Sequence, residues 1–234
     1  MGLADLHIHT IFSYDGTASV PAVLARAKKI GLDVIAITDH DEINGSLKAL
    51  ELAPQYDLEV IPAIEVTTAD GDLLALNVTE KVERDQSLIE TVLKVRELGG
   101  FCIAPHPMAG GLGMKSLSAR SIMRALRNPE VAQTLIGIET FNATTIDKMS
   151  NHYAHLLGEH LKIAKLGNSD AHILKTIGRG ATQFEGHTAK DLIRAIRSRE
   201  TCVQNQKKWN AARILGSWAT NYVASLFTRI VNVT

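Results

Sequence analysis

The sequence predicts an α/β protein in which a largely parallel β-sheet is covered by helices. Apolar segments with the composition of strands recur along the 234 residues, and helix-like segments lie between most of them. This alternation favours parallel strands, because two parallel neighbours need a long crossover connection, usually a helix. It leaves two arrangements open, a doubly wound open sheet and a closed barrel. No G-x-G-x-x-G motif follows the first expected strand, which argues against dinucleotide binding.

Apolar periodicity, together with helix-start and helix-stop residues, gives the order of the elements. The first expected helix begins at Ser19, carries Pro21 in its first turn and stops at Gly31. The other expected helices cover residues 43–53, 87–98, 117–126, 146–161 and 188–199. The expected strands cover residues 3–8, 33–38, 58–66, 72–78, 101–105, 135–141, 163–168 and 180–184.

The segment that follows Gln204 has a different character. Its apolar residues fall at positions 211, 215, 218, 222, 226 and 230, which is a helical period. Residues 214–228 carry no charge, but this stretch is shorter than the roughly 20 residues that a membrane span needs. We expect one domain at 1–204 and an amphipathic helical extension at 205–234 that packs on it. A homodimer contact or a membrane-surface position of this helix is the alternative.

Composition and charge indicate a globular, water-soluble chain. Hydrophobic residues make up 45% and charged residues 21%, and 25 basic residues balance 25 acidic ones. No overall basic field points to nucleic acid, although a local cleft could still hold it as a substrate. Cys102 and Cys202 lie in apolar runs and are expected to be buried, reduced thiols. Because the N-terminus also lacks the pattern of a signal peptide, we expect a cytoplasmic protein.

Two histidines close the first expected strand on a single face. His7 and His9 are two residues apart, and alternate residues of a strand point to the same side. Burying two neighbouring imidazoles without a partner is costly, and a shared cation would satisfy both. One such pair is weak evidence, but metal-capable residues recur at other strand ends. The full set of candidate ligands is His7, His9, Asp15, His40, Glu65, His106, Asp170 and His172.

This set of side chains predicts a metal centre. The carboxyl ends of parallel strands meet at one side of a β/α fold, so residues far apart in sequence are collected there. Imidazole together with carboxylate suits zinc, manganese or iron(II). Eight ligands exceed the needs of one ion and indicate two or three, an arrangement typical of phosphate-ester hydrolysis. The absence of a G-x-S-x-G motif agrees with attack by water.

The motifs that carry these residues resemble those of the PHP (polymerase and histidinol phosphatase) superfamily of metal-dependent phosphoesterases. They occur in the family's order and span residues 1 to about 185. They are ADLHIHT at 4–10, SYDG at 13–16, AITDHD at 36–41, IPAIEVTT at 61–68, APHP at 104–107 and GNSDAH at 167–172. The resemblance implies a distorted, TIM-like (β/α) barrel of seven strands, followed here by the C-terminal helix.

The resemblance also implies roles for individual residues. The first of three ions would be held by His7, His9 and Asp170, and the second by Glu65 and His106. The third would be held by Asp15, His40 and His172. Glu65 would bridge the first two ions. A hydroxide between two ions would attack phosphorus, and Asp5 and Asp39 would orient imidazoles. One departure is GDLLAL at 71–76, where relatives often have a histidine in place of Asp72. Asp72 either offers an oxygen ligand or leaves the second ion weakly held.

Residues beyond the ions are harder to assign from sequence. Arg179 is the candidate for binding the substrate phosphate, with a surface ion pair as the alternative, and Lys175 is a weaker one. Phe12 and Tyr14 are the candidates for stacking on a base, or else they pack under the loop. Glu139 is expected to line the pocket without binding metal. His152, His155, His160 and His187 are expected to belong to solvated helix faces.

The sequence therefore favours a hydrolase acting on a small phosphorylated metabolite or a nucleotide. The first alternative is an exonuclease-type phosphodiesterase that acts on oligonucleotides by the same chemistry. The second is a noncatalytic metal-binding or regulatory module, against which the near-complete ligand set argues. The last is metal-dependent hydrolysis of a C–N or carboxyl-ester bond, which we rank below the others because no lysine is placed to be a carbamylated bridge and Glu65 fills that role.

Overall fold

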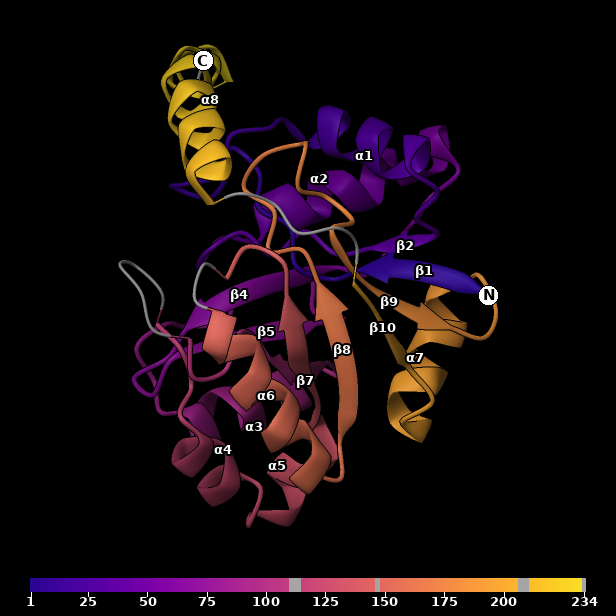
Figure 1. The fold of residues 1–234 in the computed structure, drawn as a ribbon, viewed down its shortest axis with the longest axis vertical. Helices are drawn as coiled ribbons and strands as arrows, with labels where there is room; N and C mark the ends of the chain where they lie inside the picture. The colour runs from indigo at the N-terminus through magenta and orange to yellow at the C-terminus, as the bar shows by residue number, and fades with distance from the viewer. Residues whose placement is uncertain (110–114, 146–147, 206–210, 233–234) are drawn as a thin grey trace.

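The computed structural model describes residues 1–109, 115–145, 148–205 and 211–232. In these ranges the chain is an α/β fold with two five-stranded sheets (Figure 1). The first sheet has the order β10-β9-β1-β2-β3 and consists of β1 (Gly2–Asp5), β2 (Val34–Ile35), β3 (Glu59–Val60), β9 (Gly180–Phe184) and β10 (Cys202–Asn205). The second has the order β4-β5-β6-β7-β8 and consists of β4 (Ala63–Thr67), β5 (Asp72–Leu76), β6 (Phe101–Ala104), β7 (Leu135–Asn142) and β8 (Ala164–Asn168).

The helices follow the predicted order, with two additions, η1 and α5. They are α1 (Val20–Lys29), α2 (Asn44–Leu52), the 3₁₀ helix η1 (Ala53–Tyr56), α3 (Leu88–Glu97), α4 (Ala119–Ala125), α5 (Pro129–Thr134), α6 (Lys148–His160), α7 (Ala189–Ser198) and α8 (Ala211–Asn232). The first two residues of the expected helix 146–161 lie outside the described residues. Helix α5 is not predicted, although Asn128 caps it and Pro129 occupies its first turn.

The sheets are mixed, which corrects the expectation of largely parallel strands. β1–β2, β2–β3, β6–β7 and β7–β8 pair parallel, but β4–β5, β5–β6, β1–β9 and β9–β10 pair antiparallel. The turn at Thr68–Gly71 is too short for a crossover, so β4 and β5 form a hairpin. The expected strand 58–66 is two strands, β3 and β4. They are separated at Pro62, which has no N–H for a ladder.

Ten strands in two sheets are described, not the seven strands of a closed barrel. The sheets meet at two isolated bridges, Ile8 with Ala171 and His40 with Glu65. Near these bridges side chains take the place of ladder hydrogen bonds. The backbone N–H of Ile8 donates to Thr38 Oγ1 at 3.2 Å, and that of Thr10 donates to Asp39 Oδ1 at 2.6 Å. Regular pairing is thus interrupted where the metal-capable residues lie.

Three clusters of buried apolar side chains fill the space between sheets and helices. One cluster includes Leu6 and Phe184 from around the first sheet and Leu74 and Ile103 from the second, so the two sheets share a core. The others lie beneath α3 to α5 and beneath α1 and η1. Cys102 is buried as expected, but Cys202 is exposed on β10, which corrects the prediction for that thiol.

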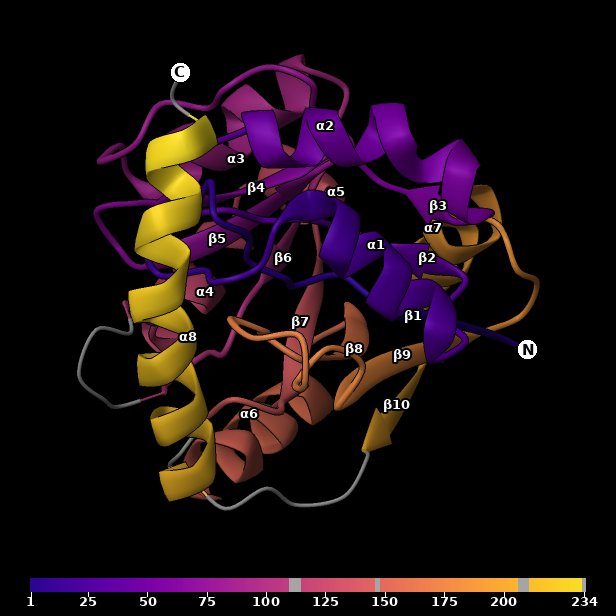
Figure 2. The ribbon, with the colours of Figure 1, turned by 90° about the horizontal axis from the view of Figure 1, so that it is seen from above.

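Helix α8 stands at the end of the molecule to which β7 and β8 point (Figure 1). In Figure 2, α2 and β4 lie toward the C-terminal end of α8, and α6 lies toward its start. Its apolar positions are not all packed as expected, because Leu215 and Leu226 are exposed. None of the described helices has the length and apolar character needed to cross a membrane. The predicted domain division at residue 204 and the homodimer contact through this helix stay predictions.

Candidate metal centre

All eight predicted ligands are collected at one place in the structure. His7 and His9 follow β1, His40 follows β2, and Glu65 lies on β4. The others lie in the turns after β6 and β8 and in the loop between β1 and α1. Their ligand atoms form four overlapping groups, each with all atoms within 4.8 Å of one another. The groups are His9, Asp15, His40 and His172; His7, Glu65 and His106; His7, His9 and Asp170; and His40, Glu65 and Asp72.

Glu65 lies at the centre of this cluster and is fully buried. Its Oε2 is 3.1 Å from Nε2 of His7, 3.3 Å from Nε2 of His9 and 3.3 Å from Nδ1 of His40. Its Oε1 is 3.3 Å from Nε2 of His106. Burial alone would raise the pKa of this carboxyl, but His7 and His40 outweigh it and hold the pKa well below its usual range. A carboxylate shared in this way has the geometry to bridge two cations.

Asp170 and Asp15 supply anionic oxygens on the other side of the histidines. Asp170 Oδ1 is 3.3 Å from Nε2 of His9 and 3.4 Å from Nε2 of His7. Asp15 Oδ2 is 3.0 Å from Nε2 of His172 and 3.5 Å from Nε2 of His40. Asp170 holds its position with a φ of 51°, a region that non-glycine residues rarely adopt. Such strain persists where the surroundings over-determine it and is frequent at functional sites.

The state of His9 tests whether these residues fit a cation. Both of its ring nitrogens are buried and neither makes a hydrogen bond. Burial, with help from His172 and His40, lowers its pKa to about 4, so the ring is neutral near pH 7. A buried imidazole without a hydrogen bond is costly, and Nε2 of this ring lies 3.3 Å from carboxylate oxygens of Glu65 and Asp170, with which it could share a cation. The donor set of imidazoles and carboxylates therefore fits zinc, manganese or iron(II).

Asp72 joins the cluster as a further carboxylate. Its Oδ1 is buried and has no hydrogen-bond partner, and it groups with His40 and Glu65. Burial and the nearby charge of Glu65 raise its pKa to about 6. An oxygen donor at this position thus lies within reach of His40 and Glu65. Its role as a ligand stays a prediction.

Among the described residues, the carboxylates of Asp5 and Asp39 hydrogen-bond to loop groups and to no imidazole, which corrects the orienting role expected for them. Asp5 accepts hydrogen bonds from the backbone N–H groups of Ser169 at 3.0 Å and Gly178 at 2.9 Å. Asp39 accepts from the N–H of Thr10 at 2.6 Å and from its hydroxyl at 2.7 Å. Both are fully buried. Their hydrogen bonds to backbone N–H groups hold the loops that carry the candidate ligands in position.

Glu139 on β7 is the residue that orients an imidazole, a role that sequence reasoning missed. Its Oε1 is 2.9 Å from Nδ1 of His7, which leaves Nε2 of that ring toward Glu65. Its Oε2 accepts from the backbone N–H of His106 at 2.8 Å and from Nδ2 of Asn142 at 3.0 Å. The available signal was its place as a charged residue within the strand-like run GIETFN, on the side of the site.

We expect Glu139→Gln to weaken metal binding by about 10- to 100-fold while the fold persists. Glutamine keeps the size of the side chain, but its neutral amide no longer stabilises His7 as a ligand. Isothermal titration with zinc would measure the change. Glu97→Gln on the exposed face of α3 is the matched control. Equal zinc affinity for the two variants would contradict the orienting role.

The remaining candidates lie outside the cluster or at its edge. Arg179 donates from Nε to the carbonyl of Lys175 at 3.5 Å, and its phosphate-binding role stays a prediction. Tyr14 is exposed and stacks on His40, with ring centroids 5.0 Å apart. Phe12 is also exposed. Among the described residues, none of the histidines of α6 belongs to a metal-capable group. His187 instead pairs with Asp33 at 2.8 Å.

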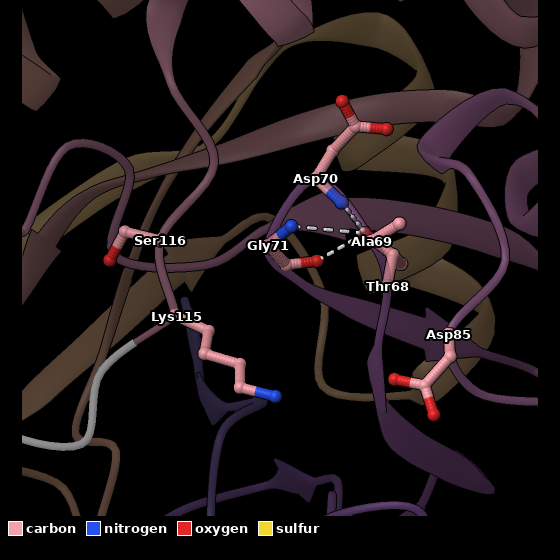
Figure 3. Close-up of a pocket in the computed structure, with 7 residues that line it drawn as sticks. All are labelled: Thr68, Ala69, Asp70, Gly71, Asp85, Lys115 and Ser116. Carbon is pink, nitrogen blue, oxygen red and sulfur yellow. Dashed lines mark hydrogen bonds between the residues drawn. The ribbon is translucent and has the colours of Figure 1, made fainter.

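A cavity of about 390 Å³ lies beside the turn between β4 and β5. It is lined by Thr68, Ala69, Asp70, Gly71, Asp85, Lys115 and Ser116. Figure 3 shows Lys115 and Ser116 opposite this turn, with Asp85 at the far side. The hydroxyl of Ser116 lies 3.2 Å from Nδ1 of His106, which connects the cavity to the metal-capable groups. Its volume is of the size that small molecules occupy.

The fold and this cluster define an α/β protein whose overlapping groups of imidazoles and carboxylates, arranged around one buried glutamate, are able to hold metal ions. The profile of the PHP domain family matches residues 5–199. The chain belongs to that family.

Several individual proteins are also similar to this chain. An uncharacterised protein of Methanocaldococcus jannaschii is 34% identical over 161 residues, which is 64% of this chain and 88% of that protein. A 5'-3' exoribonuclease of Haemophilus influenzae is 26% identical over 82% of this chain and 62% of its own length. Among solved structures, a two-domain protein from Bacteroides vulgatus containing a predicted PHP-like metal-dependent phosphoesterase superposes with a TM-score of 0.69. That match has 18% identity and covers 87% of this chain and 64% of the other, so it supports the fold alone.

Proposed function

We propose that the protein is a metal-dependent hydrolase of phosphate esters that acts on a small phosphorylated metabolite or a nucleotide. The observation that carries the proposal is the overlap of the four donor groups, which share Glu65, His7, His9 and His40. One isolated group would suit a structural ion. Overlapping groups suit two or three neighbouring ions, the arrangement used for in-line displacement at phosphorus.

Divalent ions in this cluster would lower the pKa of a water molecule and neutralise charge on the phosphate. The protein's own residues would hold and align the reacting groups. Glu65 would keep neighbouring sites at a fixed separation, since its two oxygens face different histidines. Glu139 would fix the ring of His7, and Asp5 would fix the turn that carries Asp170 through the N–H of Ser169.

The cavity beside Ser116 supports a small substrate. It adjoins the cluster through His106 and offers an amine from Lys115 together with carboxylates of Asp70 and Asp85. A leaving group that carries one negative and one positive charge could pair with the Lys115 amine and with these carboxylates. Arg179 stays the proposed contact for the phosphate itself.

An exonuclease acting on oligonucleotides is the second candidate. The likeness to the Haemophilus influenzae exoribonuclease favours it, because that match extends over 82% of this chain. The exposed ring of Tyr14 beside His40 is a surface on which a base could stack. The balanced charge of 25 basic and 25 acidic residues favours the small substrate.

The test uses the metal-depleted full chain, reconstituted separately with zinc, manganese and iron(II). Each sample is given an aryl phosphate monoester, an aryl phosphodiester and a short oligonucleotide labelled at its 3' end. We expect hydrolysis of the monoester to appear with metal and to vanish with a chelator. Stepwise shortening of the oligonucleotide in place of monoester hydrolysis would favour the exonuclease. Metal-loaded protein that cleaves none of the three would contradict both and leave a binding module.

A further inference from the structure

One face of α8 is directed at the loop Ser13–Gly16, which carries the candidate ligand Asp15. Trp218, Tyr222, Ser225 and Arg229 are spaced by four, three and four residues, so they lie along one side of the helix. Trp218 donates from Nε1 to the carbonyl of Asp15 at 2.9 Å. Arg229 donates to the carbonyls of Ser13 at 2.8 Å and Gly16 at 2.5 Å.

The helix residues also brace one another. The rings of Trp218 and Tyr222 stack with centroids 5.0 Å apart. The guanidinium carbon of Arg229 lies 5.8 Å from the centre of the Tyr222 ring, a cation–π distance. Ser225 is buried between these turns. These contacts within the helix therefore hold the side chains of Trp218 and Arg229 in the orientation in which they bind the loop.

The loop is held from its other side as well. Gly16 lies so close to Thr10 that a Cβ there would come within 2.0 Å of the Thr10 carbonyl oxygen. The hydroxyl of Ser13 donates to Asp15 Oδ1 at 2.6 Å. The remaining oxygen of Asp15 faces His172 at 3.0 Å and His40 at 3.5 Å. The backbone of this residue is thus bound by α8 while its carboxylate is directed into the metal cluster.

We propose that α8 is a positioning element of the active site, which through Arg229 and Trp218 fixes the loop that presents Asp15 to the ion shared with His9, His40 and His172. The proposal rests on the proposed function, because it concerns an ion whose binding is itself proposed. It gives the C-terminal helix a role beyond packing. An arginine that binds two carbonyls of a ligand-bearing loop acts on the ion through that loop, as residues behind a ligand do.

The experiment measures zinc binding to the full chain by isothermal titration, with the zinc content after dialysis as a second readout. In Arg229→Ala we expect the site that includes Asp15 to bind zinc about 10- to 100-fold more weakly, with the other ions retained. Arg229→Lys should recover part of the affinity, because an ammonium group still donates to carbonyls. Trp218→Phe removes one N–H donor and should give a smaller loss in a fold that keeps the aromatic packing.

Arg213→Ala removes an exposed arginine nearer the start of α8 and is the matched control. Coupling is reciprocal, so zinc should also slow amide hydrogen exchange in α8 of the wild type. Unchanged zinc affinity in Arg229→Ala, Arg229→Lys and Trp218→Phe, with no effect of zinc on hydrogen exchange in α8, would overturn the proposal. Wild-type protein that binds zinc but hydrolyses no ester would contradict the proposed function and leave this inference standing.

Discussion

Glu65→Gln is expected to lose at least two of the bound ions and to lower turnover by at least about a hundredfold. The Glu65 carboxylate lies within 3.3 Å of nitrogen atoms of His7, His9, His40 and His106. A neutral amide in its place presents an N–H₂ group to part of this ring of donors, and it removes the anion that two of the four donor groups share. Loss of the ions would remove several kcal/mol of transition-state stabilisation. Each 1.36 kcal/mol lost lowers the rate by a factor of ten.

Metal content by elemental analysis and monoester hydrolysis would measure the two effects together. The metal-free variant should also be less stable toward urea by about 3 kcal/mol, because the buried imidazoles lose their charge partner. Glu97→Gln serves again as the control for loss of one carboxylate at the surface. A Glu65→Gln protein that keeps its full metal content would exclude a bridging role.

His9→Ala should lose at least one ion and abolish measurable turnover while the fold is retained. His9 belongs to two of the donor groups, so its removal affects two sites. Stability without metal should change by less than about 2 kcal/mol, because two effects oppose each other. The cavity left by the ring destabilises, and the removal of two buried nitrogens without hydrogen bonds stabilises.

His155→Ala is the matched histidine control, since His155 is exposed on α6. It should change neither the zinc content nor the rate. Urea unfolding of both variants separates loss of chemistry from loss of structure. A His9→Ala protein with wild-type turnover would place the reaction elsewhere, and a large loss in His155→Ala would overturn the assignment of that helix to the surface.

The candidate ligands could be predicted from the sequence because their positions depend on a local rule. His7, His40 and His106 each follow a strand, and residues that follow strands of like direction gather at one side. The rule holds although the sheets are mixed, since β1 and β2 run parallel, as do β6, β7 and β8. The antiparallel pairings of β5, β9 and β10 were the part that alternation of strands and helices could not reveal.

Contacts that depend on distant partners were beyond the sequence. Glu139 lies 132 positions from His7, and only the assembled sheets bring its carboxylate to Nδ1 of that ring. Asp5 and Asp39 precede histidines in motif-like order, yet their oxygens bind loop N–H groups. The contact of Arg229 with Ser13 joins residues 216 positions apart. For helix α8, the apolar period predicted that Leu215 and Leu226 would be packed against the domain, but both are exposed.

The central claim is that imidazoles and carboxylates from separate strands jointly bind a cluster of cations around Glu65. Anomalous diffraction from zinc-loaded crystals tests it most directly. We predict two or three zinc peaks beside Glu65, each about 2.0–2.2 Å from histidine nitrogens or carboxylate oxygens of the four donor groups. Zinc peaks confined to surface histidines such as His155 or His187, with none beside Glu65, would contradict the account.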